Sequence, residues 1–174
     1  MNILSVHKDI GQVLDIYRDR LDNIPDERFT ETPPGGDWSY AEVYSHILQA
    51  TLGSSILLEK CTLSSCRPTL QKPTLLGLFV LTSGRFPLRV KAPNDIAAKI
   101  PAVKISKEEA KNLLIKCRKR IDHIIPLVKN ASPKCRYPHS RLGMLNAKQW
   151  FKFIIIHAKH HLKQLDRIQK EFHS

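Results

Sequence analysis

Hydrophobic residues recur every three or four positions in four separate stretches of the chain, which is the spacing of amphipathic α-helices. The first stretch covers residues 6–21 and the second covers residues 39–61. The third begins at Ser106 and the fourth at Asn146, while Pro126 is expected to disturb the last turn of the third helix. The pattern predicts an all-α protein with four main helices.

Three of these stretches begin with the same short signal, a Ser or Asn followed three residues later by Glu or Gln. In such a capping box each side chain accepts a hydrogen bond from the backbone N–H of the other residue. Two backbone N–H groups at the helix start, which have no partner within the helix, are thereby paired. The pairs are Ser39 with Glu42, Ser106 with Glu109, and Asn146 with Gln149.

The connection between the second and third helices, residues 62–105, is long, rich in proline and without a sustained period. Within it, residues 75–81 are apolar enough for a short helix or a strand, and periodicity does not decide between them. A long connection inside a compact protein is more often a crossover or a functional segment than a plain loop. We therefore expect one domain over residues 1–174, a four-helix bundle with a long crossover between helices two and three.

The net charge of +12 is unevenly distributed along the chain. Residues 1–84 contain 7 basic and 10 acidic residues, whereas residues 85–136 contain 14 basic and 4 acidic ones. A basic region is compatible with nucleic acid or anionic substrates. Aromatic residues are scarce there, with Phe86 alone before Tyr137, so a base-stacking platform is missing. This favours a solvated basic face and argues against nucleic acid as a partner.

The apolar runs argue against export and against a membrane partner. The N-terminus lacks the apolar region of a signal peptide, and the longest apolar run, TLLGLFVLT, is shorter than the roughly 20 residues of a membrane span. We therefore expect a soluble, cytoplasmic protein. Cys117 fits a buried helical position, and Cys61 and Cys66 could meet across a loop. A structural disulfide is not expected in the cytoplasm.

The last helix places histidines on its apolar face, where core residues are expected. His157 and His161 are one turn apart on this face, so their rings lie side by side, whereas His160 is rotated by about 100° onto a flank. The face comprises Trp150, Ile154, His157, His161, Leu165, Ile168 and Phe172.

His46 is likewise a histidine on the apolar, inward face of the second helix. A lone histidine on an apolar face is usually a hydrogen-bonded core residue, but two at i and i+4 together with a third on another helix favour metal ligation. Three imidazoles without a fourth protein ligand are typical of an open, catalytic-type site. Glu42, one turn before His46, is a weaker candidate because the cap explains it. The remaining histidines are expected to be solvated: His7, His123, His139 and His173.

The motifs WSYAEVYSHI (residues 38–47) and HSRLGMLNAKQWFKFIIIHAKHHLKQL (residues 139–165) resemble those of the DinB-like superfamily, which includes the YfiT-like proteins. That family's pattern has a tryptophan and a capping serine before a histidine on helix two, and H-x-x-x-H on the last helix. A leucine-glycine turn, here Leu142 and Gly143, precedes the last helix. Together the motifs cover only about 40 residues, and residues 62–105 match nothing in the pattern.

The resemblance implies helices arranged up-down-down-up, a divalent metal ion held by His46, His157 and His161, and often a homodimer. The ion could be Zn, Ni, Fe or Mn, and imidazole suits Cu equally. Characterised relatives include transferases that attach low-molecular-weight thiols such as bacillithiol or mycothiol to electrophiles, and a thiol-dependent isomerase. The fold alone does not fix the reaction.

Three hypotheses follow, and the first is an enzyme. A metal ion on the three histidines would activate water or a small thiol, giving a hydrolase or a thiol S-transferase that acts on small electrophilic substrates. A thiol bearing carboxylates could bind Arg85, Arg89 and Lys91 if these line the pocket. The second hypothesis is a non-catalytic metal-binding or small-ligand-binding stress-response protein. The third is a nucleic-acid-binding protein, which steep salt dependence would reveal.

Overall fold

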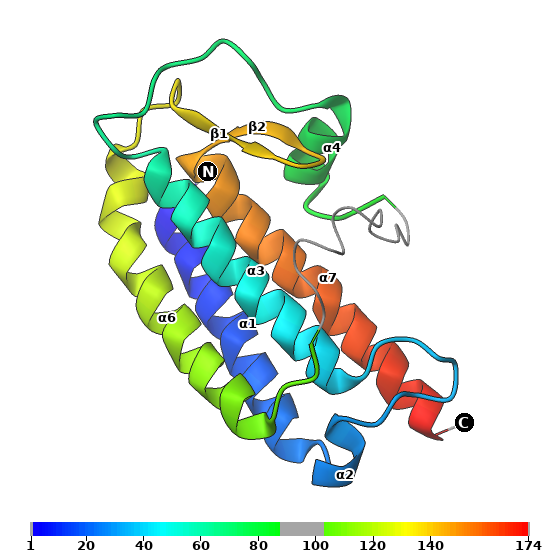
Figure 1. The fold of residues 1–174 in the computed structure, drawn as a ribbon. Coiled ribbons are helices and arrows are strands. Elements are labelled where there is room, and N and C mark those ends of the chain that lie inside the picture. Colours follow the sequence, from blue (N-terminus) through cyan, green and yellow to red (C-terminus); the bar gives the residue numbers. More distant parts are fainter. Residues whose placement is uncertain (1, 88–102, 174) are drawn as a thin grey trace.

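The computed structural model describes residues 2–87 and 103–173, and four long helices dominate this part of the chain. Helix α1 runs in one direction, α3 and α6 run in the opposite direction, and α7 returns parallel to α1 (Figure 1). The predicted all-α bundle with up-down-down-up helices is therefore confirmed. The long helices are α1 (Ile3–Asn23), α3 (Tyr40–Lys60), α6 (Lys107–Asn130) and α7 (Ala147–His173).

Two tyrosines join three of these helices inside the core. The hydroxyl of Tyr17 on α1 donates to the carbonyl oxygen of Ala158 on α7 at 2.8 Å. The hydroxyl of Tyr44 on α3 donates to the carbonyl oxygen of Tyr17 at 2.7 Å. Both tyrosines are fully buried, and their burial raises the pKa of each phenol. The rings thus contribute apolar contact while their hydroxyls remain satisfied, which holds α1, α3 and α7 in register.

The predicted capping boxes are present at all three helix starts. The Ser39 hydroxyl accepts from the backbone N–H of Glu42, whose carboxylate accepts from the backbone N–H of Ser39 at 2.8 Å. Ser106 with Glu109 and Asn146 with Gln149 make the same reciprocal bonds. The helix starts that these signals predicted therefore lie within one residue of those in the structure.

Pro126, expected to disturb the last turn of the third helix, lies inside helix α6. Helix α6 continues through this proline to Asn130 and is not broken in its last turn. Proline lacks the N–H of one helical hydrogen bond, but Ile124 and Val128 on either side are fully buried. Their packing holds the last turn of α6 in helical conformation.

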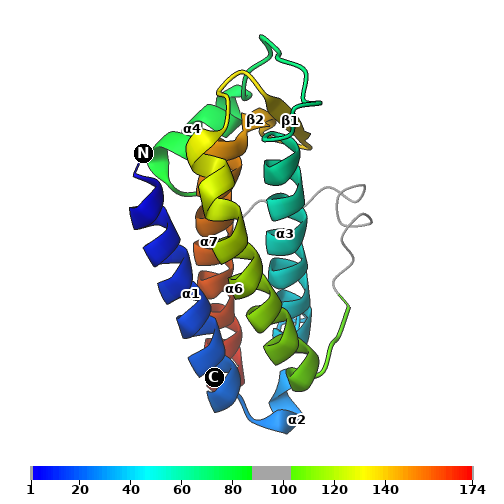
Figure 2. The ribbon, with the colours of Figure 1, turned by 90° about the vertical axis from the view of Figure 1, so that its left-hand side faces the viewer.

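The crossover supplies a helix and the chain after α6 supplies a hairpin, and both lie at the end of the bundle where α7 begins (Figures 1 and 2). The ambiguous apolar segment is helix α4 (Leu75–Ser83), and the hydrophobic pattern did not predict the short helix α2 (Asp26–Phe29). The antiparallel strands β1 (Arg136–His139) and β2 (Gly143–Asn146) were not predicted either.

The Leu142–Gly143 turn is where the hairpin meets the crossover. Gly143 has a φ of 78°, and a Cβ there would lie 2.7 Å from the backbone nitrogen of Thr74. Thr74 is the N-cap residue of α4. Its backbone N–H donates a hydrogen bond to the carbonyl oxygen of Leu142, and its hydroxyl donates one to the carbonyl oxygen of Arg141. The glycine thus lets two backbone segments approach closely, which positions α4 against the start of α7.

Much of the basic charge of α6 is paired with acidic residues on its neighbours. Acidic side chains from residues 1–84 therefore form ion pairs with basic side chains of α6 at the helix interfaces. This pairing weakens the argument for a free basic surface. The pairs are Lys107 with Asp26, Lys111 with Asp22, Arg118 with Asp15, and Arg120 with Glu59.

All four cysteines are free thiols, and Cys117 is buried as expected. Cys66 lies beside Cys135, whose thiol donates to the carbonyl oxygen of Cys66 at 3.2 Å. Burial, and then the neighbouring thiol of Cys135, raise the pKa of the Cys66 thiol to about 11. The contact thus joins the crossover to the chain just before β1.

Candidate metal centre

His46, His157 and His161 converge at the interface between α3 and α7. One ring nitrogen from each histidine lies within 4.8 Å of the others, and no other such group of His, Cys, Asp or Glu occurs among residues 2–87 and 103–173. His161 is buried, with 7% of its surface exposed, whereas His46 and His157 are half-buried. The three histidines singled out from the sequence are therefore brought together by the fold.

Two of the three nitrogens are spaced almost as ligands of one transition-metal ion would be. The Nε2 atoms of His157 and His161 are 3.0 Å apart. Two nitrogens bound tetrahedrally to one zinc ion at about 2.0–2.1 Å lie about 3.3 Å apart. A small adjustment of the two side chains therefore suffices for both to ligate one ion. The part of the chain that the structure describes adds no fourth His, Cys, Asp or Glu to the group, so a further position remains for a small molecule.

Aromatic rings surround the three histidines. The Trp38 ring lies 5.2 Å from that of His46, and the Phe153 ring stacks on that of His157 at 5.2 Å. Phe86, which follows α4, lies 6.2 Å from His157 and 4.9 Å from His160. His160 is thus on the flank, against Phe86. The apolar surroundings restrict water around the nitrogens and strengthen polar interactions at the centre.

The surroundings keep the imidazoles of His157 and His161 neutral at neutral pH. Burial, and then the neighbouring histidines, hold the pKa of His157 well below its usual value. Burial also lowers the pKa of His161 to about 3, with a further contribution from His46. Only neutral imidazole can ligate a metal ion, so this lowering favours ligation.

Gln164 is a residue of the centre that sequence reasoning missed. Its Oε1 atom lies 2.8 Å from Nδ1 of His161, on the ring edge away from His157. The signal in the sequence was its position three residues after His161, which places both on one side of the helix. Glu42 remains the capping residue of α3, with its Oε2 atom bonded to the backbone N–H and hydroxyl of Ser39.

His139 corrects the expectation that it is solvated. Its ring lies 4.6 Å from Phe153 and 5.3 Å from Trp150, and its Nδ1 atom accepts the backbone N–H groups of Arg141 and Leu142. It therefore supports the hairpin turn. Burial, and then the charge of Arg141, lower its pKa to about 4.

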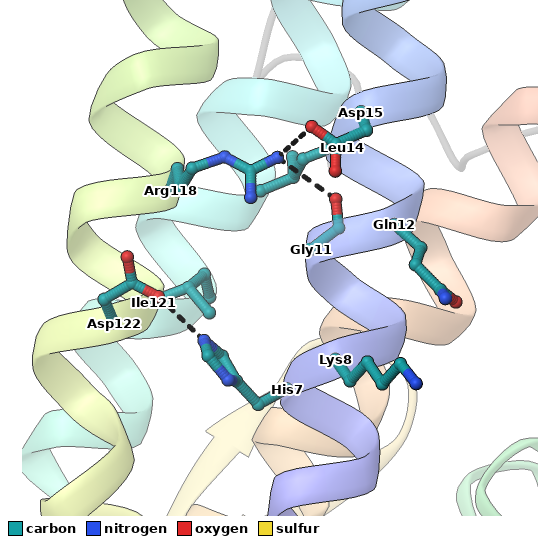
Figure 3. A pocket seen from close by; sticks show the side chains of 9 residues that line it. All are labelled: His7, Lys8, Gly11, Gln12, Leu14, Asp15, Arg118, Ile121 and Asp122. Atoms are coloured by element: carbon teal, nitrogen blue, oxygen red, sulfur yellow. Dashed lines mark hydrogen bonds and ion pairs between the residues drawn. The ribbon is translucent and has the colours of Figure 1, made fainter.

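The other discounted histidines lie outside the centre. His123 and His173 are exposed, as expected. His7 is half-buried and its Nε2 atom lies 2.7 Å from a carboxylate oxygen of Asp122. This contact belongs to a groove of about 370 Å³ between α1 and α6, which the Arg118–Asp15 ion pair also lines (Figure 3). None of the three converging histidines lines this groove.

Comparisons with known proteins agree with this arrangement. The family model of the DinB superfamily matches residues 10–165. The uncharacterized protein YuaE of Bacillus subtilis (strain 168) is 23% identical over 152 residues, which cover 87% of this chain and 89% of YuaE. The crystal structure of TT2238, described as a four-helix bundle protein, superposes with a TM-score of 0.62 at 17% identity, covering 95% of this chain and 99% of TT2238. No described helix is long and apolar enough to cross a membrane. With the family model matching most of its length, the chain belongs to the DinB superfamily.

Proposed function

We propose that this protein is a metal-dependent enzyme that acts on small electrophilic substrates, as a hydrolase or as a low-molecular-weight-thiol S-transferase. The observation that carries the proposal is the convergence of His46, His157 and His161, with one nitrogen of each within 4.8 Å of the others. Three imidazoles that are buried or half-buried between two helices are costly for the core unless they serve a polar function. Membership of the DinB superfamily agrees with a metal site.

Each residue has a distinct role in this proposal. His161 is the buried ligand, and His46 and His157 complete the set from the half-buried side. A divalent ion bound there would act as a Lewis acid and lower the pKa of a water or thiol that it binds. Phe86 and Phe153 restrict water beside His157, and Trp38 does so beside His46.

The exposure of the ligands supports an open site over a closed one. Two of the three histidines are half-buried, so a small molecule could reach the side of the centre that faces away from the core. Arg85 is exposed and immediately precedes Phe86, which suits an anionic thiol; Arg89 and Lys91 lie outside the described residues. The alternative is a non-catalytic metal-binding or small-ligand-binding protein, for which the same three histidines would serve.

Metal analysis tests the proposal first. Protein purified without a histidine tag and without added metal should contain about one divalent ion per chain, and its identity would distinguish Zn, Ni, Fe, Mn and Cu. Small thiols with an electrophile, and simple esters, are then assayed from about pH 5 to about pH 9, with and without chelator. Turnover that chelator abolishes supports the enzyme. Chelator-insensitive turnover rules out the metal mechanism, and metal binding without turnover favours the binding protein.

A homodimer, a single domain over residues 1–174 and a cytoplasmic location complete the proposal. Sedimentation of the purified protein tests the dimer, limited proteolysis tests the single domain, and fractionation of the source cells tests the location.

A further inference from the structure

The hydrogen bond between His161 and Gln164 determines which nitrogen of His161 carries a proton. Nδ1 of His161 lies 2.8 Å from Oε1 of Gln164, and an amide oxygen can only accept a hydrogen bond. With Oε1 as the facing acceptor, we assign the proton of this neutral ring to Nδ1. The lone pair is then on Nε2, the nitrogen that lies 3.0 Å from Nε2 of His157.

The same bond fixes the arrangement of protons between the two histidines. Because Nε2 of His161 has no proton, it accepts a hydrogen bond from Nε2–H of His157 when no metal ion is present. His161 thus presents its ligand lone pair to the centre before any ion arrives. His157 has to move or lose its Nε2 proton when a metal ion takes the place of that hydrogen bond, whereas His161 does not.

We propose that Gln164 is a positioning residue of the metal centre, which holds His161 as the Nδ1–H tautomer and orients its Nε2 atom toward His46 and His157. The inference rests on the proposed metal site. Gln164 touches neither the ion nor the substrate and acts through His161 alone. Side chains that bond the second nitrogen of a ligating histidine typically raise metal affinity 10- to 100-fold.

Helix geometry makes Gln164 suited to this role. It lies three residues after His161, so its side chain is beside the ring on the same side of α7. Gln164 is half-buried, which limits competition from water for Nδ1. An ordinary structural glutamine would contribute only to the stability of the helix, and its loss would not change the tautomer of His161.

Three variants separate these roles. Gln164→Leu removes the acceptor, Gln164→Glu keeps an acceptor at the same position, and Gln169→Leu makes the apolar change at an exposed site on α7. The tautomer of His161 is measured by ¹⁵N NMR of the metal-free proteins, and Zn²⁺ affinity is measured by competition with a chromogenic chelator. We expect the Nδ1–H tautomer in the wild type, in Gln164→Glu and in Gln169→Leu, and a mixture of tautomers in Gln164→Leu.

The affinity for Zn²⁺ should fall about 10- to 100-fold in Gln164→Leu and stay within about threefold of the wild type in the other two proteins. An unchanged tautomer and affinity in Gln164→Leu would overturn the positioning role while the metal site itself stands. If the wild type binds no Zn²⁺ or other divalent ion, the proposed function fails. A wild-type His161 with its proton on Nε2 overturns the inference without any variant.

Discussion

The rings of His46 on α3 and His161 on α7 lie with their centroids 4.9 Å apart, although most of the chain separates them in sequence. His157, one turn before His161, places its ring 5.4 Å from that of His46. A half-buried or buried imidazole needs polar partners, and here the nearest polar side chains include the other two histidines. Bringing the two helices together therefore creates a donor set that neither helix has alone.

Replacement of a ligand should remove the metal ion without unfolding the protein. In His157→Ala we expect the metal content to fall at least about tenfold, because two imidazoles hold an ion far less well than three. The fold should persist, since Trp150, Ile154, Leu165 and Ile168 still pack the inner face of α7. Elemental analysis measures the metal and circular dichroism measures the helix content.

A substitution of His160 is the matched control for the ligand variants. His160 contacts Phe86, and it is not part of the converging group. His160→Gln should therefore leave Zn²⁺ affinity within about threefold of the wild type, well short of the 10- to 100-fold typical of groups that orient a ligand. A loss as large as that in His161→Ala would show that His160 belongs to the ligand set.

His139 should make the metal-free protein less stable in acid. Its pKa is about 4 in the folded protein and near 6.5 in the unfolded chain, so the unfolded state binds the proton more readily. Its stabilising contribution is fully present above about pH 6.5 and is lost as the pH falls toward 4, by up to about 3 kcal/mol.

Urea unfolding in chelator at several pH values between about 7 and 5 measures this loss for the wild type and for His139→Asn. The variant keeps an acceptor for the N–H groups of Arg141 and Leu142 but does not titrate. The difference between the two proteins isolates His139 from the histidines of the metal centre. Equal pH dependence in the two proteins would mean that His139 is not held neutral by its surroundings.

Arg120 should stabilise the interface between α6 and α3. Its Nη2 atom lies 2.6 Å from Oε2 of Glu59, and its Nε atom donates to the hydroxyl of Ser55 at 3.0 Å. Arg120→Met should lower the free energy of unfolding by about 1–2 kcal/mol, because a half-buried charged group loses several hydrogen bonds at once. Lys119→Met, at an exposed position on the same helix, should change it by less than about 0.5 kcal/mol. Equal effects of the two substitutions would contradict the role of Arg120.

Gly143 should not tolerate a side chain. Gly143→Ala is expected to destabilise the protein by about 1–3 kcal/mol, because its φ of 78° is unfavourable for alanine and the new Cβ would meet Thr74 and Lys72. Gly53 in α3 is the matched control, since a Cβ there meets nothing within 4 Å. Gly53→Ala should stabilise the protein by about 0.4–1 kcal/mol. Thermal unfolding distinguishes the opposite signs of the two changes.

Local sequence signals were enough to predict the starts of α3, α6 and α7 and the inward positions of His46, His157 and His161. Capping boxes and the period of apolar residues are local signals, because each depends on hydrogen bonds or contacts within a few residues. Once α7 has formed, its geometry places His157 and His161 on one face whatever packs against it. The pairing of these two with His46 was a hypothesis from the sequence and from the resemblance of its motifs.

Tertiary structure alone decided the features that depend on distant neighbours. The β1–β2 hairpin lies over the start of α7, where it buries His139 against Trp150 and Phe153. Local sequence could not show that His139, at the end of β1, would be enclosed, nor that α6 would continue through Pro126 between the buried Ile124 and Val128. The physical reason is that burial and long-range packing set these outcomes, and both are properties of the assembled bundle.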